Sequence, residues 1–170
     1  MTNSMLFSGN APLNEELEYV SPAYCDSFDA EMCPSSVGNR QNLSPLLRAS
    51  CWGFEDVVKQ LVDDGADVYE RDVKGETALH KAARFGHLAT AIALLRSGCE
   101  LDVRDNLGMT PLHWAALNGN AQLSRLLLLH QADTKIRDHY AGGMTAKEMA
   151  ELMGHNSVLR IMEKYRWASE

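Results

Sequence analysis

A repeat with a period of thirty-three residues constrains the fold of this chain more than any other feature. Residues 75–80 (GETALH) return as residues 108–113 (GMTPLH), with the same offset at every position. A fixed period of this length is typical of repeat proteins, whose structural units pack mainly on their neighbours along the chain. The sequence therefore predicts an elongated array with an extended surface, rather than a globular fold around one closed core.

The same period extends the repeat on both sides. The segment GADV at 65–68 aligns with GCEL at 98–101 and with QADT at 131–134. After the third copy the offset becomes thirty-five residues, which indicates a two-residue insertion at Ala141 and Gly142. Four units follow from this alignment, with residues 1–38 outside the array; the units are residues 39–71, 72–104, 105–139 and 140–168.

The stretches GETALHKAARFGH and GMTPLHWAALNGN resemble the ankyrin-repeat family, and the match is most specific in the second and third units. The resemblance implies an all-α solenoid of about four helix-turn-helix units with short β-hairpin-like loops between them. It also implies that partners dock on the hairpin tips and on the concave face formed by the first helix of each unit.

Physical chemistry supports the same helix boundaries. Thr77 and Thr110 are suited to cap helix N-termini, where the first backbone N–H groups lack partners inside the helix. Pro111 then falls at the first helical position, where its missing N–H costs nothing. Gly86 and Gly119 are expected to end the first helices in a left-handed conformation that a Cβ disfavours.

The composition argues against several classes of protein. No apolar run approaches the length of a membrane span, and no basic region followed by an apolar core marks a secretory signal. The four cysteines form no C-x-x-C pair, so no zinc ribbon or redox motif is expected. We expect neither a metal nor another cofactor, and reduced thiols in a protein of the cytoplasm, the nucleus or both.

The net charge of −7 is unevenly distributed. Residues 1–40 carry six acidic residues and one basic residue, which leaves −2 for the rest of the chain. Direct binding to nucleic acid usually requires a basic face, and none is evident, so the expected partner is another protein.

The N-terminal segment, residues 1–38, is predicted to be mostly disordered from its polar and acidic composition. Two patterns complicate that prediction. Residues 13–20 could form two helical turns, and Tyr24, Phe28 and Met32 recur every fourth residue among acids. Such interleaving is typical of segments that fold on a partner. The segment could equally cover the apolar end of the first unit, or be an inert tail.

The histidines and cysteines give no sign of catalysis. Four of the six histidines occupy recurring repeat positions, where we expect them to hydrogen-bond the backbone of neighbouring loops, and His130 and His139 are isolated. No G-x-S-x-G, P-loop or H-E-x-x-H motif is present. The chain is therefore predicted not to be an enzyme.

The predicted protein-binding surface follows from the resemblance, position by position. Large apolar residues replace the usual polar ones near the end of each first helix, at Trp52, Phe85, Leu117 and Met153. They could anchor a partner or instead pack into the core. Further contacts are predicted from the same helices and from the tips between units: Arg84, Trp114 and Asn118 on the helices, and Val73, Lys74, Glu76, Asn106, Leu107 and Met109 at the tips.

These features predict a non-catalytic adaptor or inhibitor, monomeric on its own, that binds another protein through its repeats. One alternative is a nuclear transcriptional co-regulator that uses the acidic N-terminal segment. Another is a regulatory or targeting subunit of an enzyme complex. The fourth unit is expected to close the array, because polar residues replace the Leu-His pair there and Ile161, Met162 and Tyr165 form an apolar helix edge.

Overall fold

The computed structural model describes residues 43–140 and 142–165 of the chain. Within these ranges the chain forms helices and loops, with a single isolated β-bridge between Arg137 and Thr145. The helices in chain order are α2 (Pro45–Trp52), α3 (Glu55–Asp63), α4 (Ala78–Phe85), α5 (Leu88–Arg96), α6 (Pro111–Leu117), α7 (Ala121–Leu129), α8 (Ala146–Leu152) and α9 (Asn156–Tyr165).

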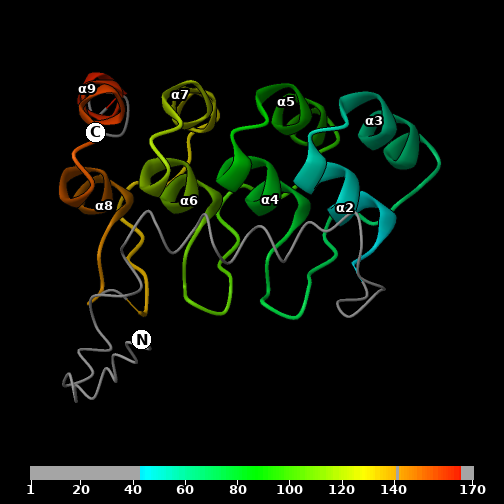
Figure 1. The fold of residues 1–170 in the computed structure, drawn as a ribbon, viewed down its shortest axis with the longest axis horizontal. Coiled ribbons are helices and arrows are strands. Elements are labelled where there is room, and N and C mark those ends of the chain that lie inside the picture. Colours follow the sequence, from blue (N-terminus) through cyan, green and yellow to red (C-terminus); the bar gives the residue numbers. More distant parts are fainter. Residues whose placement is uncertain (1–42, 141, 166–170) are drawn as a thin grey trace, which may run out of the picture.

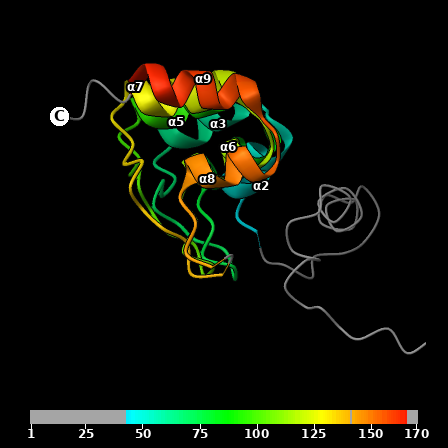
Figure 2. The same cartoon turned by 90° about the vertical axis from the view of Figure 1, so that its left-hand side faces the viewer.

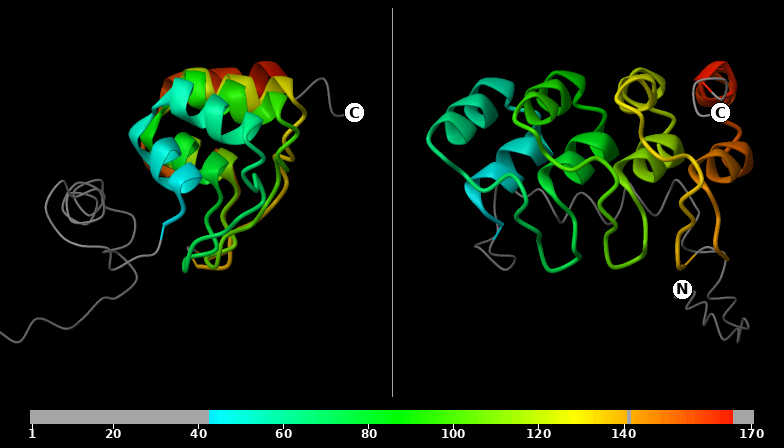
Figure 3. Two further views of the ribbon diagram at one scale, coloured as in Figure 1. Left: turned by 90° about the vertical axis from the view of Figure 1, so that its right-hand side faces the viewer. Right: turned by 180° about the vertical axis from the view of Figure 1, so that it is seen from behind.

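The helices form two layers, as Figure 1 shows. The first helices of the units (α2, α4, α6 and α8) stack in one row, and the second helices (α3, α5, α7 and α9) stack in a parallel row. The loops between units project together from the side of the first helices (Figures 2 and 3). This arrangement confirms the predicted all-α solenoid of four helix pairs. Residues 1–38 lie outside the described residues, so the predictions for that segment stay predictions.

Small residues set the distance between neighbouring first helices. Ala82 and Ala83 on α4, and Ala115 and Ala116 on α6, are completely buried. Leu94 and Leu127 fill the space beneath the second helices and are also buried. Alanine allows the backbones of adjacent helices to approach closely, whereas leucine supplies most of the apolar area removed from water.

A buried histidine links each of the two central units to the next one. Nδ1 of His80 accepts a hydrogen bond from the backbone N–H of Thr77 at 3.1 Å, which caps the N-terminus of α4. Its other ring nitrogen, Nε2, donates to the carbonyl oxygen of Met109 in the next loop at 3.2 Å. His113 repeats this arrangement with Thr110 and with the carbonyl of Met144. The predicted backbone bonds of these histidines are therefore confirmed.

The two bonds require a neutral imidazole protonated on Nε2. Burial lowers the pKa of both His80 and His113 below its ordinary value, because an imidazolium ion would lose its hydration. Nearby Asp105 and the backbone acceptors oppose this effect without reversing it. The link between units is consequently strongest when both rings are uncharged.

A second link joins the end of each first helix to the turn of the following unit. At this turn a polar side chain donates to a carbonyl of the preceding first helix and passes over its terminal glycine. The close approach is possible because the glycine has no Cβ. The three donors and their acceptors are His87 to Cys51 at 3.0 Å, Asn120 to Ala83 at 2.9 Å and His155 to Leu117 at 3.0 Å.

This packing separates two effects of replacing glycine by alanine. Gly119 and Gly98 both have a positive φ, of 69° and 79°, but only a Cβ at Gly119 meets the neighbouring His155 ring, at 2.8 Å from Nδ1. We expect Gly98→Ala to lower the free energy of unfolding by about 1–2 kcal/mol from backbone strain alone. Gly119→Ala should cost about 1–3 kcal/mol more, because His155 must move. Denaturant unfolding of both variants measures the difference. Equal losses would contradict the close contact between units.

The buried histidines also predict how stability depends on pH. The unfolded chain protonates these rings at about pH 6.5, whereas the folded protein does so only at lower pH. Their contribution is therefore present above the unfolded pKa and is lost as pH falls through the lowered folded pKa. We expect the free energy of unfolding to decrease between about pH 7.5 and 5.5. His113→Asn should unfold more easily, but with a shallower pH dependence; an unchanged slope would show that His113 is not held neutral.

Candidate protein-binding surface

The first helices carry equivalent side chains in two columns along the array. On α2, the helix at one end of the described array, the exposed positions are Pro45, Arg48 and Trp52, spaced three and four residues apart on one side of the helix. The positions equivalent to Arg48 and Trp52 in the later units therefore lie on the same side of the solenoid. One column contains Arg48, Lys81, Trp114 and Met149, and the other contains Trp52, Phe85, Asn118 and Met153.

Aromatic side chains gather at the first unit. Trp52 is 42% exposed, and its ring stacks on that of Phe54 with centroids 6.3 Å apart and planes 7° from parallel. Val57, on the first turns of α3, is also exposed. In the next unit Phe85 is half-buried, with its ring centroid 6.2 Å from that of His87. Exposed aromatic rings of this kind contribute large contact area when a partner covers them.

A cluster of charged groups lies beside this patch in the second unit. Nζ of Lys81 pairs with the carboxylates of Glu76 and, at 2.7 Å, of Asp72. Nη1 of Arg84 lies 3.2 Å from Oε1 of Glu76. Burial alone would lower the pKa of Lys81, but the two carboxylates outweigh it and the pKa is raised. Burial lowers the pKa of nearby Lys74, against the opposing charge of Glu76.

Arg84 connects this cluster to the third unit. Its guanidinium carbon lies 4.5 Å from the centre of the Trp114 ring and 5.8 Å from that of Phe85, both within the range of cation–π attraction. Trp114 in turn donates from Nε1 to Oδ2 of Asp105 at 2.9 Å. Lys81 and Trp114 thus occupy equivalent positions and satisfy equivalent loop aspartates with different chemistry.

The structure corrects part of the predicted surface. Glu76 and Met109 are 1% and 0% exposed, so their predicted exposure at the tips is wrong. Glu76 turns back to pair with Lys81 and Arg84, and Met109 occupies the equivalent position within the core. Leu117 is 8% exposed and Trp114 4%, so neither extends an open apolar row. Leu117 joins the core, and Trp114 is held by Asp105 and Arg84.

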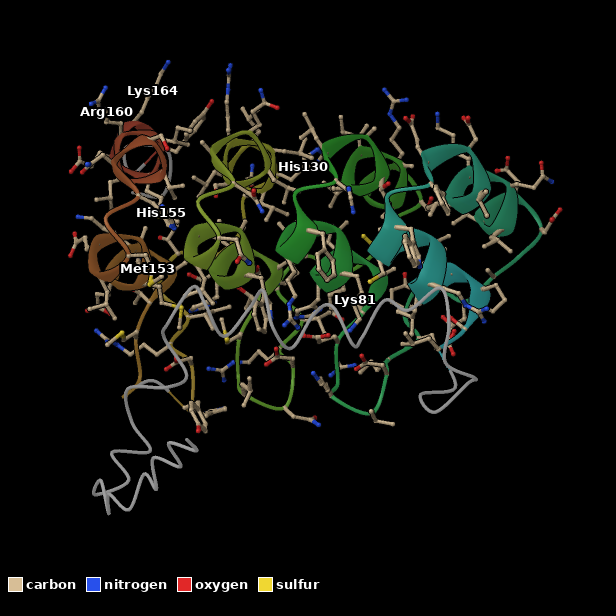
Figure 4. All side chains as sticks on the ribbon, viewed as in Figure 1. Lys81, His130, Met153, His155, Arg160 and Lys164 are labelled. Atoms are coloured by element: carbon tan, nitrogen blue, oxygen red, sulfur yellow. The ribbon has the colours of Figure 1, made fainter. Side chains whose placement is uncertain are left out.

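The remaining predicted residues are at least partly accessible. Val73, at the first tip, is the most exposed large apolar residue described, and Asn106 at the next tip is also exposed. Asn106 donates from Nδ2 to the carbonyl of Val73, which ties adjacent tips together. Met153, on the last unit, is half-buried (Figure 4). The others of intermediate exposure are Lys74, Arg84, Phe85, Leu107 and Asn118, although the Arg84 side chain itself is only 8% exposed.

Sequence reasoning missed Phe54, Val57 and Arg48 as surface residues. The alignment of the units does distinguish Phe54, because the equivalent positions in the later units are His87, Asn120 and His155. Those polar residues bond the end of a preceding helix, whereas Phe54 caps α3 without a side-chain hydrogen bond and is exposed. An aromatic residue at a position where the later units have a hydrogen-bond donor could therefore have indicated an exposed ring at Phe54.

The described residues offer little for catalysis or metal binding. Within 43–140 and 142–165 no three His, Cys, Asp or Glu side chains are placed to hold a metal ion. Burial raises the pKa of the Cys99 thiol to about 11, so this group stays protonated and weakly nucleophilic near neutral pH. No helix in the same ranges is long and apolar enough to cross a membrane.

The charged cluster predicts an effect of exchanging residues between equivalent units. Glu76→Met copies Met109 but deprives Lys81 and Arg84 of a carboxylate, so we expect a loss of about 3 kcal/mol in the free energy of unfolding. Adding Lys81→Trp copies Trp114, whose indole can donate to Asp72 as Trp114 does to Asp105. We expect the double variant to recover at least half of the loss in denaturant unfolding. A double variant as unstable as the summed single variants would contradict the equivalence of the two positions.

Comparison with known proteins agrees with this architecture. The family model for ankyrin repeats (three copies) matches residues 25–105, 46–138 and 93–165, which together cover most of the chain. The putative ankyrin repeat protein RF_p14 of Rickettsia felis is 48% identical over 50 residues, which are 29% of this chain and 79% of that protein. The E3 ubiquitin-protein ligase XBAT33 of Arabidopsis thaliana is 43% identical over 52 residues, 31% of this chain but only 10% of the ligase. The family match and the stacked helix pairs lead to one conclusion: this chain belongs to the ankyrin-repeat family.

Proposed function

We propose that this protein is a non-catalytic adaptor or inhibitor that binds another protein through the first helices of its first two units. Ankyrin repeats are in general protein–protein interaction modules. The observation that carries the proposal is the exposed Trp52–Phe54 stack, with Phe85 and Arg84 in the adjacent unit. We define these four residues, together with Arg48 and Val57, as the unit 1–2 face.

The unit 1–2 face is suited to binding because its helices are held in place before a partner arrives. Ser44 caps α2, Thr77 and His80 cap α4, and His87 bonds the end of α2. A preformed surface loses less conformational entropy on association than one that must order itself. Aromatic and arginine side chains at its centre are the types that most often dominate binding energy.

The acidic N-terminal segment supports a second candidate function, that of a nuclear transcriptional co-regulator. Residues 1–40 carry a net charge of −5, and their acids alternate with aromatic and aliphatic residues. In that role the repeats would hold a partner in the nucleus while the segment recruits a further protein. The likeness to the plant ubiquitin ligase lies within the repeats and covers a tenth of that protein, so it gives little support to a role as a ligase subunit.

The adaptor proposal is tested by combining Trp52→Ala with Phe85→Ala. Both side chains are at least partly accessible, so we expect the thermal midpoint to fall by only a few degrees, as about 1 kcal/mol produces in a chain of this size. Candidate partners are first recovered by proximity labelling in cells and then confirmed in a pull-down with the purified wild-type chain. The affinity of a confirmed partner for the double variant should be at least tenfold lower than its affinity for the wild-type chain.

The matched control is Val73→Ala with Tyr140→Ala, which removes two exposed side chains from the loops between units. This control should retain both stability and partner binding. Loss of partners in the control but not in the Trp52/Phe85 variant would move the binding surface to the loops. A large loss of stability in the Trp52/Phe85 variant would show that these rings are core residues.

A further inference from the structure

The first helices of units 1 and 2 carry positive charge without any acidic residue. Arg48 on α2 and Lys81 and Arg84 on α4 are the charged residues of these two helices. Arg48 is exposed and donates to the carbonyl of Leu43, and no carboxylate within the described ranges pairs with it. The acids of unit 1 lie instead on the second helix and in the loop after it, at Glu55, Asp56, Asp63, Asp64, Asp67 and Glu70. The side chains of Lys81 and Arg84 are only 2% and 8% exposed, and they pair with Asp72 and Glu76. An occupant of the unit 1–2 face therefore meets one exposed cation, Arg48 on α2.

The same face is apolar as well as cationic. Trp52, one helical turn from Arg48, is exposed and stacks on Phe54; Val57 on α3 is also exposed, and Phe85 lies next to Arg84. A polyanion without apolar groups would leave these rings in contact with water. A purely apolar segment would approach Arg48 without neutralising it. The complementary ligand is a peptide in which acidic residues alternate with aromatic or aliphatic ones.

This chain contains such a peptide. Residues 13–32, which lie outside the described residues, include six acids and no base. Their larger apolar side chains recur at intervals of three or four residues, which favours an amphipathic arrangement when the segment binds. The acids are Glu15, Glu16, Glu18, Asp26, Asp29 and Glu31, and the apolar residues include Leu13, Leu17, Val20, Tyr24, Phe28 and Met32.

The connection along the chain favours contact within one molecule. Residues 33–42 separate this segment from Leu43, where the described structure begins directly before α2. Ten extended residues span at most about 33–36 Å, several times the roughly 8–10 Å between packed helices. Units 1 and 2 are thus within reach, and a short flexible tether gives an effective concentration in the millimolar range, so a weak contact suffices.

We propose that residues 13–32 bind the unit 1–2 face of the same molecule and compete there with the protein partner. This inference rests on the proposed function, because it assigns to that binding face an acidic, amphipathic ligand chemistry. The external partner is expected to present the same chemistry. Access to the repeats would then depend on displacement of the chain's own acidic segment.

The test uses the full-length chain with a nitroxide spin label at Cys25, in the middle of the segment. Cys33→Ser removes the neighbouring thiol. Of the two other cysteines, Cys51 is buried, and the half-buried Cys99 has a pKa of about 11. Cys25 is therefore the preferred site of labelling at neutral pH. Mass spectrometry verifies that one label is present. Paramagnetic broadening of backbone amide NMR signals then reports which helices the label approaches.

We expect the amide signals of α2 and α4 to lose at least half of their intensity, with α7 and α9 little affected. The matched control replaces the six acids of the segment by Gln or Asn in the same labelled chain. In this neutralised control the broadening of the α4 signals should fall at least twofold. Signals near the start of α2 will stay broadened to the extent that the chain connection alone keeps the label close to them. Added salt should act in the same direction as neutralisation.

Three outcomes would overturn the proposal. The first is broadening that is absent from α4 or spread evenly over all helices. The second is α4 broadening that persists unchanged in the neutralised control. The third is broadening in a mixture of two samples: spin-labelled protein that is not isotope-enriched, and isotope-enriched protein that carries no spin label. Broadening there can arise only between molecules, so it would identify a second copy as the occupant. The proposed adaptor function is tested separately by the Trp52/Phe85 variant, so either idea can fail while the other stands.

Discussion

A neutral imidazole that bonds in two directions holds the central units of this array in register. His80 accepts from the N-cap of its own helix and donates to the carbonyl of Met109 in the next loop, and His113 repeats the pattern. Because the ring is buried, both bonds form without competition from water. In the fourth unit Glu148 takes over only the first of these tasks: its carboxylate accepts from the N–H of Thr145 at 2.7 Å. A carboxylate cannot donate, so Glu148 does not bond a loop carbonyl as the histidines do; its Oε2 lies instead 3.3 Å from Nη1 of Arg137 in the preceding loop.

The fixed register lets one backbone position carry different chemistry in successive units. Asp72 and Asp105 hold their loops by accepting backbone N–H groups through Oδ1, and each uses Oδ2 for a side chain of the following helix. That partner is Lys81 in one unit and Trp114 in the next. The ammonium group brings Glu76 and Arg84 into a buried ionic cluster, whereas the indole presents a ring to Arg84. The repeat therefore fixes where a side chain lies, and the residue type fixes what that side chain can bind.

The fold could be predicted from the sequence because the recurring residues perform the same task in successive units. The cap at Thr77 and the bonds of His80 and His113 follow from spacing along the chain and were predicted correctly. The burial of Glu76 and Met109 could not be inferred in the same way, because it depends on how a loop folds back onto helices of its own and the next unit. Leu117 and Trp114 show the same limit. Their helix face follows from periodicity, but their exposure depends on contacts across units that no local pattern records.

The position of residue 54 explains why the aromatic patch lies at the first unit. In later units the equivalent residue is His87, Asn120 or His155, and each is needed to bond a helix end in the unit before it. A substitution there would leave a carbonyl without its partner and weaken the contact between units. Phe54 has no such helix end to bond within the described residues, so its side chain is free to stack on Trp52. The first unit can therefore place apolar surface where a ligand can reach it, at little cost to the packing of the array.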